Sequence, residues 1–396
     1  MMGPGSGESA VRRRYRSLVA LSAGSLLAVT ACGAGDTSAT SATSPAAGST
    51  GTESAAASVK TIAFAVHNQG SGQFVELAQR FVDYGKQVGI EVKIYNNNGD
   101  AATAISNAQL MVQAKPDVIV EFPPVADATA RITSVFKGSG IPCIAVNIPV
   151  EGCPFFNQSQ ETFAKLQAEQ FAKLMKEKGW DGTNTTVVIG QGATFGQTVN
   201  IAVTKFYEEI SKAVPGMTVV TADKITPQTT TISPQGIQID TSVDASKAFT
   251  AMNEALQTIP KNRNIIAYAI SDDDIVGINR ALKTAGRAEK SMVAGFGCDA
   301  HALEGLRTNP AWVGESCGWF THWGEFLVAM AVAVKNGAQT PETTFSPMVV
   351  LNKENVDQYF APGDTNPKKF APLPDVSKYL GETGILQKFG NVEGLS

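Results

Sequence analysis

Short apolar runs alternate with amphipathic segments from residue 59 onward, and this alternation constrains the fold more than any other feature. Residues 61–66 form an apolar run typical of a strand buried on both faces of a sheet. Apolar residues then recur at helical spacing from Phe74 to Val88. The same pair of patterns repeats to about residue 147 and starts again near residue 160. Such alternation predicts parallel sheets covered by helices on both faces.

The restart predicts an α/β protein with two Rossmann-like lobes. The expected strands cover residues 61–66, 91–95, 118–122, 143–147, 185–190, 218–222, 265–270, 292–296, 313–316 and 347–351. The expected helices cover residues 74–88, 101–114, 125–137, 160–178, 195–214, 245–258, 275–285, 300–308 and 319–336. Residues 226–241 are polar with little periodicity, which predicts a loop or a hairpin. The tail from residue 352 is expected to pack on the surface or near the connection between the lobes.

The N-terminus has the layout of a secretory signal. Four arginines between residues 12 and 16 precede an apolar run over residues 18–31, which is too short to span a membrane. Small residues then lead into Cys32, in an arrangement that resembles the lipobox of bacterial lipoproteins. The resemblance implies a signal peptide over residues 1–31 and a lipid on Cys32. A cysteine placed here by chance after an ordinary signal is the alternative.

The composition predicts a flexible tether after Cys32 and a negative net charge for the mature chain. Residues 33–58 are almost entirely Gly, Ala, Ser and Thr, which predicts a disordered tether over 32–58 that reaches roughly 30 Å. The whole chain carries 32 basic and 36 acidic residues, and loss of residues 1–31 removes four Arg and one Glu, leaving a net charge of −7. This balance argues against nucleic acid as a partner and against electrostatic adhesion to anionic lipid. The membrane contact is therefore assigned to the lipid anchor alone.

Four further cysteines remain in a chain expected outside the cytoplasm: Cys143, Cys153, Cys298 and Cys317. An even number in an exported chain suggests two disulfides, and sequence allows three pairings. The local pairs, Cys143–Cys153 and Cys298–Cys317, are favoured. Four buried thiols are the alternative. No metal site is expected, because the spacings are wide and the chain has three histidines.

Two motifs resemble catalytic or nucleotide-binding signatures. Residues 190–196 follow a predicted strand but have the spacing GxGxxxG, so they predict a tight turn that lets Gln197 face a ligand rather than a dinucleotide loop. Residues 314–318 match GxSxG, which leaves a serine hydrolase using Ser316 as an alternative. The one later histidine, His322, is too close in sequence to reach Ser316, so no catalytic residue and no enzyme activity are predicted.

Aromatic, amide and acidic side chains follow the predicted strands, where ligands of open α/β sheets bind. Of the consecutive acids at 272–274, one is expected to enter the cleft and another to cap the next helix, without a metal. Rings can stack on the C–H faces of a carbohydrate while amides bind its hydroxyls. The aromatic candidates, some of which could instead be core, are Phe74, Phe122, Trp319, Phe320 and Trp323.

Several segments in order carry a resemblance to a known family. They are Ile62–Val66, Ala114–Val120, Ile141–Asn147, Ala269–Asp273 and Val293–Phe296. Over residues 60–351 the chain resembles the sugar-binding lipoproteins of bacterial ABC importers, in the ribose-binding-like branch of the type I periplasmic-binding fold. The resemblance implies three crossings between lobes, near 156–160, 318–323 and 348–351. Lobe 1 is then residues 59–157 with 321–350, and lobe 2 is residues 158–320 with 351–396.

The resemblance also implies ligand positions and shows where this chain departs from the pattern. The implied positions are His67, Ser71, Gln73, Phe74, Phe122, Asn147, Ile148, Asn200, Val243, Ser271, Gly297 and Gly318. Sugar binders of the family usually have Asp-Arg where Asn147-Ile148 stand, Arg at Asn200 and Asp at Gly297, so the charged anchors are missing. The predicted ligand-binding set is His67, Gln73, Phe74, Phe122, Asn147, Gln197, Asn200, Ser271, Asp272 and Trp319.

The expected function is capture of a sugar or sugar-like solute for an ABC permease by a monomeric, lipid-anchored, extracytoplasmic protein without a cofactor. A polyol, a cyclitol or a modified sugar fits the missing charges, with Asp272, Asp299 or Glu121 as candidate acids. A small cationic ligand is an alternative because the cleft offers acids and rings without arginine. A receptor of the same fold that presents its ligand to a sensor kinase is a further alternative.

Overall fold

The computed structural model describes residues 59–70 and 72–395. The predicted signal peptide, the tether, Cys32 and Ser71 therefore lie outside the described residues. Within the described part, none of the helices combines the length and the apolar character needed to cross a bilayer.

The first sheet has six strands in the order β12-β5-β4-β3-β1-β2, and every pair in it is parallel. The predicted strands over this half are confirmed, and two short strands, β5 and β12, are additional. The strands are β1 (Thr61–Val66), β2 (Glu91–Asn96), β3 (Val118–Glu121), β4 (Cys143–Val146), β5 (Phe155–Asn157) and β12 (Thr343–Phe345).

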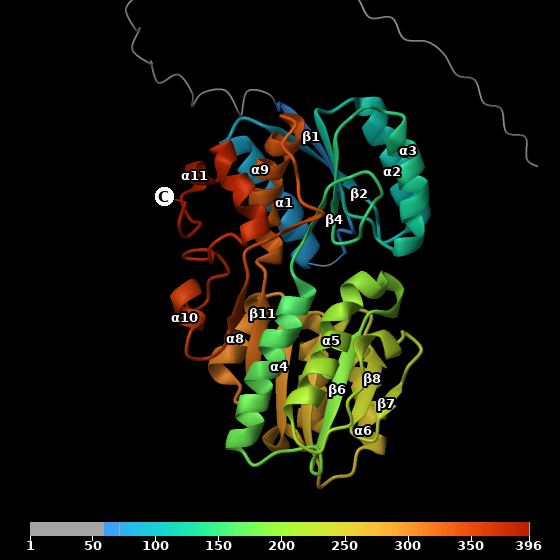
Figure 1. Cartoon of the computed structure of the whole chain (residues 1–396), viewed down its shortest axis with the longest axis vertical. Helices are drawn as coiled ribbons and strands as arrows, with labels where there is room; N and C mark the ends of the chain where they lie inside the picture. Colours follow the sequence, from blue (N-terminus) through green and yellow to red (C-terminus); the bar gives the residue numbers. More distant parts are fainter. Residues whose placement is uncertain (1–58, 71, 396) are drawn as a thin grey trace, which may run out of the picture. The chain divides into compact units, whose positions relative to one another are not determined.

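Alternate residues of β1 explain the helices on both faces of this sheet. Ile62, Phe64 and Val66 pack in one apolar cluster with helices α1 and α9, whereas Ala63 and Ala65 pack in another with α2 and α3. Figure 1 shows α1 and α9 together on one side of these strands and α2 and α3 on the other. The helices and the 3₁₀ turns before two of them are α1 (Gly72–Gln87), α2 (Ala101–Ala114), η2 (Ala126–Ala128), α3 (Thr129–Lys137), η6 (Phe320–His322) and α9 (Trp323–Lys335).

The second sheet has seven strands in the order β13-β11-β10-β9-β6-β8-β7, with parallel pairs inside and one antiparallel pair at each edge. The inner orders β2-β1-β3-β4-β5 and β8-β6-β9-β10-β11 are equivalent, so the two sheets repeat one topology. The strands are β6 (Thr185–Gln191), β7 (Thr231–Ser233), β8 (Gly236–Asp240), β9 (Asn264–Ala269), β10 (Ser291–Phe296), β11 (Trp312–Cys317) and β13 (Val349–Leu351).

Alternation along β6 again separates two helical layers. Val187 and Ile189 pack with α4 and α5, while Val188 packs in the cluster that contains α6 and α7. The two-lobed α/β fold, with mostly parallel sheets covered by helices, is therefore confirmed. The helices and 3₁₀ turns of this half are α4 (Gln160–Glu177), η3 (Ala193–Phe195), α5 (Gln197–Ala213), η4 (Ala222–Lys224), α6 (Ala245–Thr258), α7 (Asp272–Thr284), η5 (Ala288–Lys290) and α8 (Ala300–Thr308).

One predicted strand is wrong. Residues 218–221 are irregular, and β8 occupies the place beside β6 instead, in the stretch that was expected to be a loop or a hairpin. Gly236 opens β8, and a Cβ on this residue would lie 2.4 Å from the ring of Tyr207. The buried Tyr207 ring therefore requires a glycine at the start of this strand, which makes β8 look like a turn in the sequence.

Ser271 caps helix α7, so the prediction that an aspartate caps it near residue 275 is wrong. The helix begins at Asp272, and the Ser271 hydroxyl accepts a hydrogen bond of 3.2 Å from the backbone N–H of Asp274. The side chain of Asp274 is fully buried, and burial raises its pKa to about 7.

The C-terminal segment packs against helices of both halves. Helix α10 (Val356–Tyr359) contacts α8, whereas the 3₁₀ segment η7 (Asp375–Thr383) and α11 (Ile385–Phe389) contact α9. Ser377 links η7 to β12 through two hydrogen bonds to Phe345. The Ser377 hydroxyl accepts from the backbone N–H of Phe345 at 2.9 Å and donates to the backbone carbonyl of Phe345 at 2.7 Å. The segment predicted to belong to lobe 2 thus contacts elements next to both sheets.

The structure contains both favoured disulfides. Cys143 at the start of β4 pairs with Cys153, and Cys298 after β10 pairs with Cys317 at the end of β11. The two local pairings are therefore confirmed, and the alternative of four free thiols is wrong.

Candidate functional site

A cavity of about 200 Å³ is lined by residues that come directly after strands of both sheets. His67 follows β1, Phe122 follows β3 and Asn147 follows β4; Ser242 lies just beyond β8 and Gly297 follows β10. Ligands of open α/β sheets bind at these carboxyl ends, next to the point where the strand order reverses. The cavity is large enough for a small organic solute.

The lining combines rings, aliphatic side chains and uncharged polar groups. The described lining residues are His67, Asn68, Gln73, Phe74, Phe122, Asn147, Ile148, Gln158, Gln160, Phe195, Val199, Ser242, Val243, Ile270, Ser271, Phe296, Gly297 and Phe320. Among them there is no Lys, Arg, Asp or Glu.

Aromatic rings form one continuous wall. The ring of His67 stacks on Phe74 with 4.6 Å between centroids and an interplanar angle of 6°. Phe122 meets Phe74 edge-on at 5.6 Å, and Phe320 meets Phe74 edge-on at 5.4 Å. Phe195, from the other half of the chain, lies 5.7 Å from His67. Such a wall offers apolar faces on which the C–H groups of a solute can pack.

His67 adds no positive charge at neutral pH. Burial lowers the pKa of His67 to about 4. Its Nδ1 lies 2.7 Å from the side-chain nitrogen of Asn68, so Nδ1 accepts and the proton of the neutral ring resides on Nε2. His67 is thus a neutral polar group within the aromatic wall.

Amide side chains supply the hydrogen-bonding capacity of the cavity. Asn147 has φ of 62°, a left-handed conformation that asparagine adopts more readily than most residues, and it lines the wall directly after β4. Gln158 and Gln160 lie where the chain leaves β5 and enters α4, and they are 6% and 7% exposed. Each carboxamide can both donate and accept, as recognition of hydroxyl groups requires.

The nearest acids lie behind the lining. Asp272 is 4% exposed and accepts a hydrogen bond of 2.7 Å from the N–H of Asp299. A Cβ on Gly297 would lie 2.6 Å from Oδ2 of Asp272, so this carboxyl group is packed directly against the glycine. Burial, together with the negative charge of Asp299, raises the pKa of Asp272 above the usual range of a carboxyl group. Glu121 is also buried away from the lining, with its pKa raised to about 8 by burial.

The cavity brings together six of the ten residues predicted to bind ligand: His67, Gln73, Phe74, Phe122, Asn147 and Ser271. Asp272 lies behind Gly297 as described, and Gln197 is exposed on the first turn of α5. Asn200 also lies outside the lining, because its side chain holds the turn after β6. Its Oδ1 accepts from the N–H of Gly192 at 3.0 Å, and its Nδ2 donates to the carbonyls of Gly192 and Gly196.

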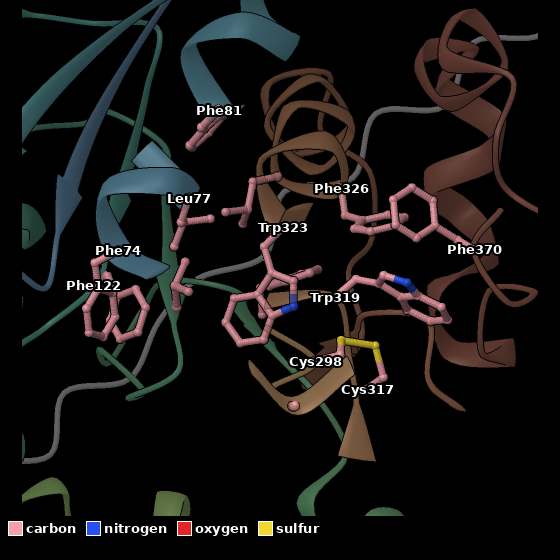
Figure 2. Packing of buried hydrophobic residues seen from close by; sticks show 14 of the residues in the cluster. Phe74, Leu77, Phe81, Phe122, Cys298, Cys317, Trp319, Trp323, Phe326 and Phe370 are labelled. Carbon is pink, nitrogen blue, oxygen red and sulfur yellow. A yellow bond between two sulfur atoms is a disulfide. The ribbon is translucent and has the colours of Figure 1, made fainter. Parts of the chain in front are cut away.

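Trp319 is part of the apolar core rather than of the cavity wall. It has φ of 51° and is 1% exposed, and its ring meets Phe370 edge-on at 5.3 Å. In Figure 2 its ring points toward Phe370 and away from Phe74 and Phe122. Its neighbour Phe320 lines the cavity instead.

Several lining residues were not singled out from the sequence. Phe195 lies in the glycine-containing turn after β6, so an aromatic residue in a predicted turn was an available signal. Gln158 lies beyond β5, which was not predicted. Ser242 lies beyond β8, which forms a hairpin with β7 in the stretch expected to be a loop or a hairpin, but the expectation gave no strand bounds there. Without the strand, the rule that ligand groups follow strand ends could not be applied to either residue.

The GxSxG motif does not assemble a catalytic pair. Ser316 lies within β11 and is fully buried, and its hydroxyl bonds the Tyr268 hydroxyl at 2.9 Å. His322 instead bonds the Tyr84 hydroxyl through Nδ1 at 2.8 Å, and burial lowers its pKa to about 3. In the part of the chain that the structure describes, no cluster of three or more His, Cys, Asp or Glu is arranged to hold a metal ion.

Comparison with known proteins identifies relatives of this chain. Residues 62–339 match the family described as a periplasmic binding protein domain. A xylitol-binding protein of Mycolicibacterium smegmatis is 25% identical over 332 residues, which cover 84% of this chain and 83% of the relative.

Solved structures share the fold at lower identity. A periplasmic solute-binding protein of an ABC transporter from Actinobacillus succinogenes, with bound D-allose, has a TM-score of 0.64 and 17% identity over 76% of this chain and 100% of that chain. A second solute-binding protein, from Mycobacterium smegmatis with bound glycerol, has a TM-score of 0.63 and 19% identity, and the match covers 78% of this chain and 99% of that chain. A third, from Bacillus halodurans with bound myo-inositol, has a TM-score of 0.61 and 18% identity, and the match covers 76% of this chain and 96% of that chain. With the type I periplasmic binding fold and a cavity at the carboxyl ends of both sheets, the chain belongs to the periplasmic binding protein domain family.

Proposed function

We propose that this protein captures a small, uncharged, polyhydroxylated solute in the cavity and delivers it to an ABC permease. The observation that carries the proposal is a lining of rings and amides without a charged side chain among its described residues. A charged solute would lose its hydration on entry and meet no opposite charge, which costs several kcal/mol. Hydroxyl groups, in contrast, can exchange water for carboxamides at little net cost.

The named ligands of the relatives support the same class of solute. Xylitol, glycerol, myo-inositol and D-allose are neutral molecules that carry several hydroxyl groups. No acid lies among the described lining residues, which also argues against the alternative of a small cationic ligand. A polyol, a cyclitol or an uncharged sugar is therefore the proposed class.

Delivery requires that the permease distinguish the loaded from the empty protein. We assign residues 59–157 with 321–350 and residues 158–320 to two bodies that move relative to one another. A solute that contacts residues after strands of both sheets binds best when the two bodies enclose it, so it shifts the conformational population. No covalent chemistry is needed for this role, and we infer that a single copy of the chain performs it.

A thermal-shift screen tests the proposal. Xylitol, myo-inositol, glycerol and D-allose are added in turn, and a ligand that binds the folded state alone raises the Tm. At least one of these neutral solutes should raise the Tm in a concentration-dependent manner. No shift with any of them would contradict the proposed class.

We also infer that the protein is held at the outer surface of a membrane by a lipid on Cys32, which follows an apolar run in the sequence. Wild-type protein should then fractionate with membranes, and Cys32→Ala should appear in the soluble or secreted fraction. A Cys32→Ala variant that stays with membranes would contradict the lipid anchor.

A further inference from the structure

Gln158 occupies an unusual place among the lining residues. It lies in residues 158–159, where the chain leaves β5 of the first sheet for α4 beside the second sheet. Its side chain lines the cavity and is almost fully buried. Its Oε1 has no hydrogen-bond partner among the described residues. Buried acceptors are nearly always paired, so this oxygen is a candidate for recognition of a ligand.

Gly318 provides the space that this side chain occupies. It lies in residues 318–319, where the chain leaves β11 of the second sheet for α9 beside the first. A Cβ on Gly318 would lie 2.0 Å from Oε1 of Gln158 and 3.1 Å from its Cδ. Two of the segments that connect the sheets therefore touch through this amide.

The glycine is needed for space rather than for backbone conformation. Gly318 is not among the residues with positive φ, so its backbone would accept an alanine. The carbonyl of Gly318 accepts a hydrogen bond of 2.9 Å from Nε1 of Trp323, a fully buried residue. This bond fixes the peptide on which the Gln158 amide rests, so an added methyl group would displace the amide rather than the backbone.

We propose that the Gln158 carboxamide binds a hydroxyl group of the captured solute, and that Gly318 is the positioning residue that leaves room for it. The inference rests on the proposed function, because it names a contact of the same cavity. The terminal amide torsion of glutamine is broad, so rotation about it can turn Oε1 from Gly318 toward a hydroxyl donor in the cavity while the amide stays in the space beside the glycine. The ligand class is a neutral solute that donates a hydrogen bond at this point.

Calorimetry with xylitol and myo-inositol tests the contact in four variants. Gln158→Met keeps the volume of the side chain and removes its acceptor, and Gln158→Ala removes the side chain beyond Cβ. Each should weaken binding about tenfold, the loss expected when one buried hydrogen bond to the ligand is removed. Gly318→Ala should weaken binding to a similar extent, and Gln158→Ala/Gly318→Ala should bind no more weakly than Gln158→Ala.

The double variant distinguishes positioning from an independent structural role. Because Gly318 acts through Gln158, the two losses must not add. Gly138→Ala is the matched control, since Gly138 has φ of −94° and a Cβ there meets nothing within 4 Å. This control should bind as wild type does.

The outcomes separate the two proposals. Wild-type affinity in Gln158→Met would overturn the contact, and multiplied losses in the double variant would overturn the positioning role of Gly318. Wild-type protein that binds none of xylitol, myo-inositol, glycerol and D-allose would contradict the proposed function, and the ligand contact with it. Where glycerol or D-allose is the solute that binds, it serves as the probe for the variants. Binding by wild type with tenfold losses in the Gln158 variants would support both.

Discussion

Trp319 and Phe320 are neighbours in the sequence, but their rings lie in different environments. The left-handed φ of 51° at Trp319 turns its ring into the core against Phe370, while Phe320 packs on Phe74 at 5.4 Å and lines the cavity. Backbone conformation at a single residue thus decides which of two adjacent aromatic residues can contact a ligand.

Alanine substitutions at Trp319 and Phe320 test whether one ring stabilises the core and the other contacts the solute. Trp319→Ala should lower the free energy of unfolding by about 3–5 kcal/mol, because it removes a large, fully buried ring. Phe320→Ala should mainly weaken solute binding, by a factor of about 3 to 10, because one stacking surface is lost. Urea denaturation measures the first effect and calorimetry the second. Reversed effects, with stability lost at 320 and binding at 319, would contradict this division.

Sequence reasoning could locate the cavity but could not resolve such details within it. Residues after β1, β3, β4 and β9 were predicted because the ends of continuous apolar strands are recognisable and because the family resemblance implies ligand positions there. Trp319 lies outside the lining because of its left-handed φ, which nothing in the sequence reports. Asn200 lies outside the lining because its amide bonds the backbone of the turn after β6, which depends on the local loop geometry.

At the scale of elements, length and periodicity explain what the sequence predicts well. The helices over 101–114, 245–258 and 300–308 were predicted with their observed bounds, because each has several turns of regular spacing or clear ends. Strands β5 and β12 have three residues each, too few to establish a period of two. Gln158 was missed for this reason, since it follows β5.

The Cys298–Cys317 disulfide joins the residue after Gly297 to the residue before Gly318. Replacing both cysteines by alanine should lower the free energy of unfolding by about 3 kcal/mol, the value expected for a closed loop of this length. Replacing Cys143 and Cys153 should have an effect of similar size, and the losses should add because the pairs belong to different sheets. Urea unfolding curves that superimpose on wild type would contradict a stabilising role.

At the scale of the whole molecule, several buried acids give stability a defined dependence on pH. Burial raises the pKa of Glu121 and of Glu325 to about 8, well above their value of 4.5 in an unfolded chain. Each holds a proton in the folded state at neutral pH and loses it on unfolding. Their contribution to stability is complete below pH 4.5 and is lost as the pH rises through 8.

Buried histidines act in the opposite direction, but in a lower pH range. The pKa of His67 is lowered to about 4 and that of His322 to about 3, so folding releases protons from them below their unfolded value of 6.5. Their stabilisation is present above pH 6.5 and is lost as the pH falls through 4. The acids therefore dominate above pH 7.

We therefore expect the free energy of unfolding to fall between pH 7 and pH 9. One such carboxyl contributes a slope of up to about 1.4 kcal/mol per pH unit below its folded pKa. Glu121→Gln should reduce this slope, and Glu354→Gln, at an exposed position, should leave it unchanged. Urea denaturation at pH 7, 8 and 9 measures this slope for wild type and for both variants. Stability that stays constant or rises over this range would contradict the assignment.

We infer that the cavity selects solutes by the absence of charge from its described lining. The most direct measurement is calorimetric titration of the protein at pH 7 with matched neutral and charged ligands: D-allose, xylitol and myo-inositol against D-gluconate and D-glucosamine. We expect binding of at least one neutral solute, and affinities at least about 100-fold lower for the anion and the cation, which would be buried without a partner. Tighter binding of gluconate or glucosamine than of every neutral solute would contradict it.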